Sequence, residues 1–158
     1  MQIPIKVEDD SLLLRAAGEN DLENLRQWKN GHRKYFFYKE MITPEQQRAW
    51  FNGFQARSND YMFIVEANGV SIGCMGIRLL DEAWDIYNVI LGLPDYGKKG
   101  LMGKAFQAML TYAQTIKKCP ATLQVLKINP AVAWYQKHGF AVTAGKTDHY
   151  SMALSNNI

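Results

Sequence analysis

The chain has 158 residues, of which 47% are apolar and 21% are charged, and its formal net charge is +3. This length and composition are typical of one folded domain and exclude a disordered chain, so we expect a single domain over residues 1–158 with its core at about 11–154. The sequence has no apolar run near the ~20 residues of a membrane span and begins without signal-peptide features, so we expect a cytoplasmic protein that does not bind membranes.

Short apolar runs and helical patterns alternate in the first half of the chain. A helix capped by Asn20 is expected to end near Gly31, and residues 43–46 (TPEQ) form a capping box that begins a second helix. Asn-Gly at 68–69 predicts a type I′ turn between two strands. Strands are expected at residues 11–15, 61–67, 70–77 and 83–91.

The second half of the chain predicts strand–helix–strand units. Apolar residues between 102 and 113 have helical spacing, and a second helix opens at Pro130 and ends near Gly139. Short strands are expected at residues 122–126, 140–142 and 150–154. Hairpins that lead into such units indicate a mixed sheet of the α+β or α/β class.

Charge is distributed unevenly along the sequence. Residues 1–95 carry a net charge of −4, whereas residues 96–147 contain eight lysines and no Asp or Glu. A segment of this kind favours an anionic partner, and the alternative is a solvated lysine-rich surface.

Cysteine and histidine residues are too scattered for a metal site. Cys74 and Cys119 are 45 residues apart, and His32, His138 and His149 form no pair at ligand spacing. We therefore expect reduced, structural thiols and no bound metal.

Glycine and lysine dominate residues 96–104 (YGKKGLMGK), between a predicted strand and a predicted helix. Glycines let a backbone approach a ligand closely, and the free N–H groups at a helix start favour phosphate. Lys98, Lys99 and Lys104 add positive charge. The segment predicts a phosphate-binding loop, with a purely structural turn as the alternative. It matches neither the Walker A loop, which needs Ser or Thr after Gly-Lys, nor the fingerprint G-x-G-x-x-G.

A second motif, residues 129–140 (NPAVAWYQKHGF), runs from a strand end through a short helix into the next strand. Taken singly, Asn129 is typical of a helix cap and Tyr135 of a core residue with a satisfied hydroxyl. The order of strand, glycine-rich loop, helix, strand and this motif resembles the GNAT superfamily of acyl-CoA-dependent N-acetyltransferases, from about Glu82 to Leu154. The resemblance implies an α+β fold with a mixed, mostly antiparallel central sheet and about four flanking helices.

The resemblance also assigns residues to acetyl-CoA. The family's loop pattern, Gln/Arg-x-x-Gly-x-Gly/Ala, reads Gly97 to Met102 here, so its first and last positions are altered. Tyr135 is implied as the general acid that protonates the leaving thiolate, and no metal is implied. The residues implied to bind the cofactor are Val89, Ile90, Leu91, Gly97, Lys98, Lys99, Gly100, Leu101, Met102, Gly103, Asn129 and Tyr135.

The general base is assigned by position. Many relatives carry Glu in the strand before the Asn, where this chain has Gln124, which accepts no proton at neutral pH. Other relatives carry a carboxylate about fifteen residues before the loop glycine, which is the offset of Asp85 from Gly100. We expect Asp85 to be the base, directly or through a water, with Glu82 and Glu66 in reserve. The alternative is that Asp85 is an outward strand residue and that solvent takes the proton.

The first half of the chain is expected to receive the acceptor amine. Residues 28–30 and 42–51 resemble acetyltransferases that act on amino-sugar nucleotides, and also ribosomal-protein and polyamine relatives. Arg33 and Lys34 would suit a nucleotide diphosphate. A cluster of four aromatic residues either lines a pocket or belongs to the core: Tyr35, Phe36, Phe37 and Tyr38.

The leading hypothesis is an acetyl-CoA-dependent N-acetyltransferase for a small primary amine, such as a nucleotide-linked amino sugar. Alternatives are an enzyme that acetylates protein or peptide amines and a non-catalytic acyl-CoA-binding regulatory module. A nucleic-acid partner is disfavoured because no recognised module or basic–aromatic stripe is present. Assembly as a homodimer is left open.

Overall fold

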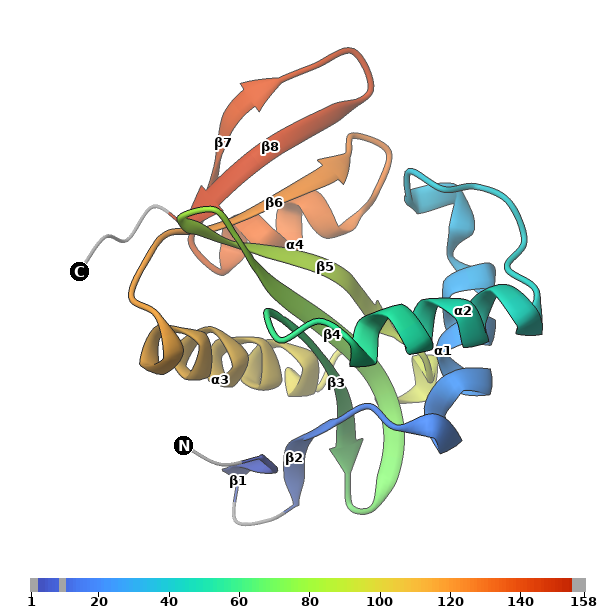
Figure 1. Cartoon of the computed structure of the whole chain (residues 1–158). Coiled ribbons are helices and arrows are strands. Elements are labelled where there is room, and N and C mark those ends of the chain that lie inside the picture. The colour runs from blue at the N-terminus through green and yellow to red at the C-terminus, as the bar shows by residue number, and fades with distance from the viewer. Residues whose placement is uncertain (1–2, 9–10, 155–158) are drawn as a thin grey trace.

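One mixed sheet with helices on both faces organises the chain, as the computed structural model of residues 3–8 and 11–154 shows (Figure 1). The strands are β1 Ile5–Glu8, β2 Leu12–Ala16, β3 Asp60–Ala67, β4 Val70–Leu80, β5 Ala83–Leu91, β6 Ala121–Leu126, β7 Phe140–Gly145 and β8 His149–Leu154. The α-helices are α1 Leu22–Gly31, α2 Pro44–Gln55, α3 Leu101–Ile116 and α4 Ala131–Lys137. Short 3-10 turns lie at Glu19–Asp21, Arg33–Tyr35 and Pro94–Tyr96.

The strand order in the sheet is β1-β2-β3-β4-β5-β6-β8-β7. Neighbouring strands are antiparallel except β5 and β6, which run parallel because α3 connects them. The predicted fold, α+β with a mostly antiparallel sheet and about four helices, is confirmed in the described residues. The strand expected first, at residues 11–15, is β2. An earlier strand that the sequence patterns did not predict, β1, pairs with it.

Strand alternation divides the core into two layers. Along β3, Phe63 and Val65 pack with α3 and α4, whereas Met62 and Ile64 pack with α1 and α2 on the other face. The two helix pairs therefore cover opposite faces of the sheet (Figure 1).

Local signals behave as expected at two of the three predicted caps and turns. Thr43 Oγ1 accepts from Gln46 N–H at 3.1 Å, and Gln46 Oε1 accepts from Thr43 N–H at 2.9 Å, which completes the capping box of α2. Asn68 and Gly69 have φ values of 50° and 82°, as a type I′ turn requires. The cap assigned to Asn20 is wrong, because Asn20 lies inside a 3-10 turn and α1 begins after Asp21.

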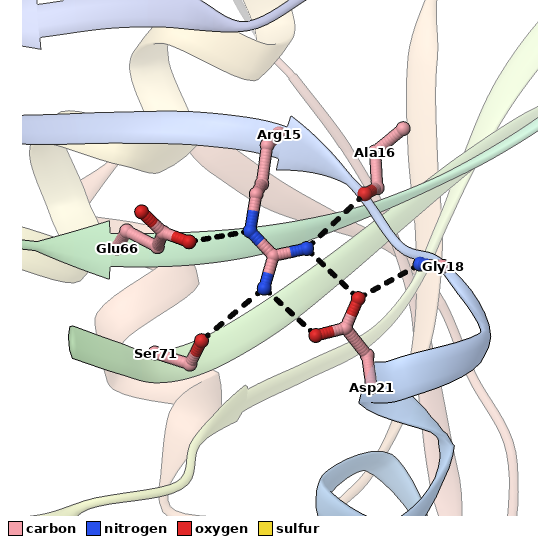
Figure 2. A network of polar contacts seen from close by, with 6 residues as sticks. All are labelled: Arg15, Ala16, Gly18, Asp21, Glu66 and Ser71. Atoms are coloured by element: carbon pink, nitrogen blue, oxygen red, sulfur yellow. Dashed lines mark hydrogen bonds and ion pairs between the residues drawn. The ribbon is translucent and has the colours of Figure 1, made fainter. Parts of the chain in front are cut away.

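Arg15 holds in place the segment that leads into α1 (Figure 2). Its guanidinium donates to both carboxylate oxygens of Asp21, at 2.8 and 2.7 Å, and to Glu66 at 2.5 Å. Asp21 also accepts from Gly18 N–H at 2.7 Å. The network fixes α1 to the ends of β2 and β3, and so it sets where α1 stands on the sheet.

No helix in the described part of the chain is long and apolar enough to span a membrane. Within residues 3–8 and 11–154, no three His, Cys, Asp or Glu side chains gather as a metal-binding group.

Candidate functional site

The parallel strands β5 and β6 separate in the middle of the sheet. Their ladder joins residues 84–86 of β5 to residues 121–123 of β6. Both strands continue past it, β5 to Leu91 and β6 to Leu126, so their C-terminal parts diverge. Three neighbouring cavities lie along this divergence, and they define the candidate site.

A β-bulge changes the direction of β5 where it diverges from β6. Gly76 of β4 pairs with Tyr87 and Cys74 pairs with Ile90, so two residues, Asn88 and Val89, oppose one. Asn88 has a φ of 50°, in the left-handed region that Asn tolerates better than most residues. The bulge turns Val89 toward the opening, where it lines two of the three cavities.

The first cavity, which we call the loop cavity, measures about 550 Å³. One wall is the glycine-rich loop with the start of α3, and the other is α4 with Trp134 and Lys137. Gly100 caps α3 with a φ of 74°, and the residues of the first helical turn, whose N–H groups have no partner within the helix, line this cavity. The expected cofactor residues that line the cavity are Val89, Leu91, Gly97, Lys98, Gly100, Leu101, Met102 and Gly103.

Several residues expected near the cofactor lie elsewhere. The Lys99 ammonium stands 5.4 Å from the centre of the Tyr96 ring, and Ile90 is buried on the α1–α2 face. Lys104 bonds Glu8 of β1 at 2.7 Å, so its charge serves an ion pair between α3 and the sheet edge. Neither Lys99, Ile90 nor Lys104 lines the loop cavity.

The second cavity, the central cavity, measures about 350 Å³ and receives Tyr135 from α4 and Asp85 from β5. Asn129 and Gln124 line it as well, so the resemblance-based residues from distant segments meet in one space. Asn129 Oδ1 accepts from Ala131 N–H at 2.9 Å, and its amide donates to the Tyr35 carbonyl at 3.4 Å. Asn129 thus both starts α4 and contacts the segment after α1.

Tyr135 is 7% exposed and packs among Phe106, Trp134 and Phe140. Burial raises the pKa of its phenol above the usual value, since the charged phenolate is poorly solvated there. The hydroxyl therefore stays protonated at neutral pH, which suits a proton donor.

Asp85 carries the carboxylate of the central cavity. Burial raises its pKa, and the Arg78 guanidinium, which donates to it at 2.9 Å, opposes that rise. Arg78 also stacks over the Tyr87 ring at 4.3 Å. The two reserve carboxylates lie outside the three cavities: Glu66 bonds Arg15, and Glu82 pairs with Lys117 at 3.6 Å.

The four aromatic residues after α1 line the central cavity, and Phe36 also packs against the α1–α2 layer of the core. Phe37 and Tyr38 are 51% and 48% exposed, and Phe37 meets the ring of His149 on β8 edge-on at 5.2 Å. Arg33 and Lys34 line none of the three cavities: Arg33 donates to the Asn30 carbonyl, and Lys34 lies 5.0 Å from the centre of the Tyr35 ring.

The third cavity, the apolar cavity, measures about 430 Å³ and lies between the sheet and helices α1 and α2. It is continuous in its lining with the central cavity, because Lys29, Tyr38, Trp50 and Asn88 border both. Lys29 donates to the side-chain oxygen of Asn88, and burial lowers its pKa to about 8.

Sequence reasoning missed Lys29, Arg78 and Asn88 as site residues. Lys29 is indistinguishable by pattern from other lysines on a helix, and only the docking of α1 shows that it points inward. The signal for Asn88 was an Asn within an apolar strand run, a residue type enriched at positive φ.

Known structures place this architecture in context. The chain is similar to spermidine N-acetyltransferase from Vibrio cholerae in complex with CoA and spermine, at TM-score 0.77 and 22% identity over 92% of this chain and 95% of that one. It is similar to RimL, a ribosomal L7/L12 α-N-protein acetyltransferase in complex with coenzyme A, at TM-score 0.77 and 16% identity over 95% and 96%. FdhC, a nucleotide-linked sugar GNAT, gives TM-score 0.75 and 17% identity over 96% and 90%.

A comparison with curated proteins finds no matching sequence. Residues 11–141 match the family model described as the acetyltransferase (GNAT) domain. The match spans most of the chain and includes both the glycine-rich loop and Tyr135. The chain therefore belongs to the GNAT acetyltransferase family.

Proposed function

We propose that this chain is an N-acetyltransferase that moves an acetyl group from acetyl-CoA to a primary amine of a small molecule. The observation that carries the proposal is the meeting of Tyr135, Asp85 and the bulged Val89 around the central cavity, beside a loop cavity bordered by a helix start and lysines. Family membership supports the acetyl-transfer chemistry. A cytoplasmic location, expected from the sequence, is part of the proposal.

The loop cavity fits the phosphates and pantetheine arm of CoA. Its lining combines the N-terminal turn of α3 with Lys98 and Lys137, and these groups complement a pyrophosphate. Val89 borders this cavity and the central one, so a chain laid along β5 would pass from one to the other. Acetyl-CoA, when bound, supplies an activated thioester.

Tyr135 and the β5 backbone have separate tasks in this proposal. A backbone N–H of the segment 89–91 that points away from β4, beyond the ladder with β6, stabilises negative charge that develops on a carbonyl oxygen. The Tyr135 phenol, kept protonated by burial, donates its proton to the leaving sulfur.

Asp85 accepts the proton that the amine loses, directly or through a water. Its raised pKa makes the carboxylate a stronger base than an exposed Asp, and the Arg78 guanidinium beside it favours the ionised form. Gln124 faces the same cavity and has no such capacity, so Asp85 is the one carboxylate that borders it among the described residues.

The acceptor amine enters through the central and apolar cavities. The proteins of similar fold act on different amines, as the names spermidine N-acetyltransferase, ribosomal α-N-protein acetyltransferase and nucleotide-linked sugar GNAT state. A nucleotide-linked amino sugar stays within the proposal as the acceptor suggested by the sequence, and a peptide amine is the alternative.

The test is release of thiol from acetyl-CoA in the presence of an amine panel with nucleotide-linked amino sugars, peptides, polyamines and amino acids. Amine-dependent release is expected from the intact chain. Saturating acetyl-CoA at about 100 times its Kd should also raise the melting temperature by about 5–10 °C. A stabilised protein that releases no thiol with any amine would indicate a non-catalytic acyl-CoA-binding module, and no stabilisation by CoA or acetyl-CoA would overturn the proposal.

A further inference from the structure

The Lys29 ammonium lies inside the site without an acidic partner. It donates to the Asn88 side-chain oxygen and stands 4.0 Å from the centre of the Phe36 ring. Within residues 3–8 and 11–154, no carboxylate forms an ion pair with it, and the charged or titratable groups that act on it are Cys74 and Arg78 of β4. A half-buried cation held by an amide and a ring is incompletely compensated.

The charges around the two acceptor cavities sum to an excess of positive charge. Lys29 and Arg78 contribute two cations, and Asp85 contributes the single carboxylate of the lining. Arg78 already pairs with Asp85 at 2.9 Å. The excess charge is therefore that of Lys29, which remains mostly protonated at pH 7 because its pKa is about 8.

The apolar cavity lies beside the Lys29 side chain, which forms part of its lining. The apolar cavity has no carboxylate in its lining, and its walls are dominated by Leu25, Ile42, Trp50, Met62 and Ile90. Its volume of about 430 Å³ falls in the range of small-molecule sites. It lies on the α1–α2 face of the sheet, away from the loop cavity that fits CoA.

We propose that the acceptor is an amine that also carries a carboxylate and an apolar group, as an apolar amino acid does, and that Lys29 binds the carboxylate. This inference rests on the proposed function. The carboxylate meets Lys29 at the junction of the two cavities, the apolar group enters the apolar cavity, and the amine reaches the central cavity beside Asp85 and Tyr135. The Asn88 amide nitrogen, which has no hydrogen-bond partner in the described residues, supplies a second donor.

Two other acceptor classes fit this lining less well. A polyamine would place further cations beside Lys29 and Arg78, where the single carboxylate is already paired. A nucleotide diphosphate would need several cationic donors, and Arg33 and Lys34 lie outside the cavities. The single Lys29 ammonium, beside one amide, matches the charge of one carboxylate.

The kinetic test uses matched amines and matched lysine variants. L-phenylalanine is compared with phenethylamine, which lacks only the carboxylate, and with phosphoethanolamine and spermidine. We expect kcat/KM for L-phenylalanine to exceed that for phenethylamine by at least tenfold. Lys29→Met, which keeps length and apolar bulk, should abolish the ratio by raising KM for the amino acid, whereas Lys34→Met on the exposed turn should preserve it. Lys29→Arg should restore part of the preference.

A preference for phenethylamine, spermidine or phosphoethanolamine, or a ratio unchanged in Lys29→Met, overturns the inference while the acetyltransferase proposal stands. A binding measurement distinguishes the opposite case, in which the acetyltransferase proposal fails and the carboxylate site remains. N-acetyl-L-phenylalanine, titrated calorimetrically into the chain, needs no turnover; we expect binding that Lys29→Met weakens at least tenfold and Lys34→Met does not. If no amine is acetylated and this binding persists, the carboxylate site stands and the proposed function fails. Absence of Lys29-dependent binding overturns the inference.

Discussion

Tyr135 combines burial with access to the reacting centre. It is 7% exposed, packs against Phe106 and still borders the central cavity. A phenol whose pKa is raised by burial holds its proton firmly until a thiolate develops beside it.

Tyr135→Phe tests this role with the smallest change, because it removes one oxygen and leaves the ring packing in place. We expect kcat to fall about 10²-fold or more while the Kd for acetyl-CoA stays within about twofold. Steady-state thiol release and calorimetric titration measure the two quantities. Turnover equal to that of the unchanged chain would exclude Tyr135 as the acid.

Asp85→Asn tests the base through pH dependence. Burial raises the pKa of Asp85, so the rate should increase with pH as this carboxyl loses its proton, above the range of an exposed Asp. The Asn variant should lose that acidic limb in kcat/KM. Glu82→Gln, on the exposed turn before β5, is the matched control and should retain the limb. A limb that persists in Asp85→Asn would assign the proton to another group or to solvent.

The sequence predicted the site residues that belong to local motifs. It did not predict those whose position depends on how a helix or a neighbouring strand packs in the fold. Tyr135 and Asp85, 50 residues apart, do share a cavity. Lys29 belongs to a helix whose polar residues look alike in sequence, and its inward direction depends on how α1 sits on the sheet. The bulge at Asn88 arises from pairing with β4, which no local pattern specifies.

At the scale of elements, α3 begins at a glycine in a left-handed conformation. Gly100 has a φ of 74° with open space where a Cβ would lie, so a side chain there would meet strain but no clash. Gly31, at the end of α1, also has open space and lacks positive φ. The two positions therefore differ in backbone strain but not in crowding.

Gly100→Ala and Gly31→Ala should therefore change stability in opposite directions. We expect Gly100→Ala to lower the free energy of unfolding by about 1 kcal/mol and to raise KM for acetyl-CoA, because the first turn of α3 shifts. Gly31→Ala should raise the free energy of unfolding by about 0.5 kcal/mol and leave KM unchanged. Urea denaturation and initial rates measure these effects. Equal effects on KM would show that the loop conformation does not matter for binding.

The sequence predicted well those elements that begin or end at a capping or turn motif. The Thr43 capping box and the Asn68-Gly69 turn place α2 and the β3–β4 hairpin, and β5 covers the expected residues 83–91. Asn20 misled because the carboxylate that orders the helix entry is that of Asp21, bound by Arg15 from a neighbouring strand. The insertion of β8 between β6 and β7 is a long-range pairing that no local segment determines.

At the scale of the whole molecule, the Arg15 network connects the sheet to the helices that enclose the acceptor cavities (Figure 2). Burial on its own would raise the pKa of Asp21, but the hydrogen bonds from Arg15 and Gly18 N–H outweigh it, and the pKa is lowered. A lowered folded-state pKa means that this carboxylate contributes its full stabilisation above the unfolded-state pKa near 4 and loses it as pH falls from there through the lower folded-state pKa.

Asp21→Asn should lower the free energy of unfolding at pH 7 by about 1–2 kcal/mol, since Arg15 loses one of its two charged partners and keeps Glu66. Below about pH 4 the difference from the unchanged chain should shrink, because Asp21 then binds a proton in the unfolded state while the folded state, with its lowered pKa, still excludes it. Denaturant unfolding followed from pH 7 to pH 3 measures it, with the exposed Glu40→Gln as control. A difference that stays constant across this range would assign the loss to packing.

The short ladder between β5 and β6 has a consequence for cooperativity. Among the residues that the structure describes, only 84–86 and 121–123 form the ladder that connects the strands β1–β5 to the strands β6, β8 and β7. A substrate whose amides bond both diverging edges would act as additional rungs between these two halves. Occupancy of the site would then slow hydrogen exchange in β6 and β8, which do not line the loop cavity, as well as in β5. The substrate would thereby add to the coupling that the shared core already provides between the two halves of the sheet.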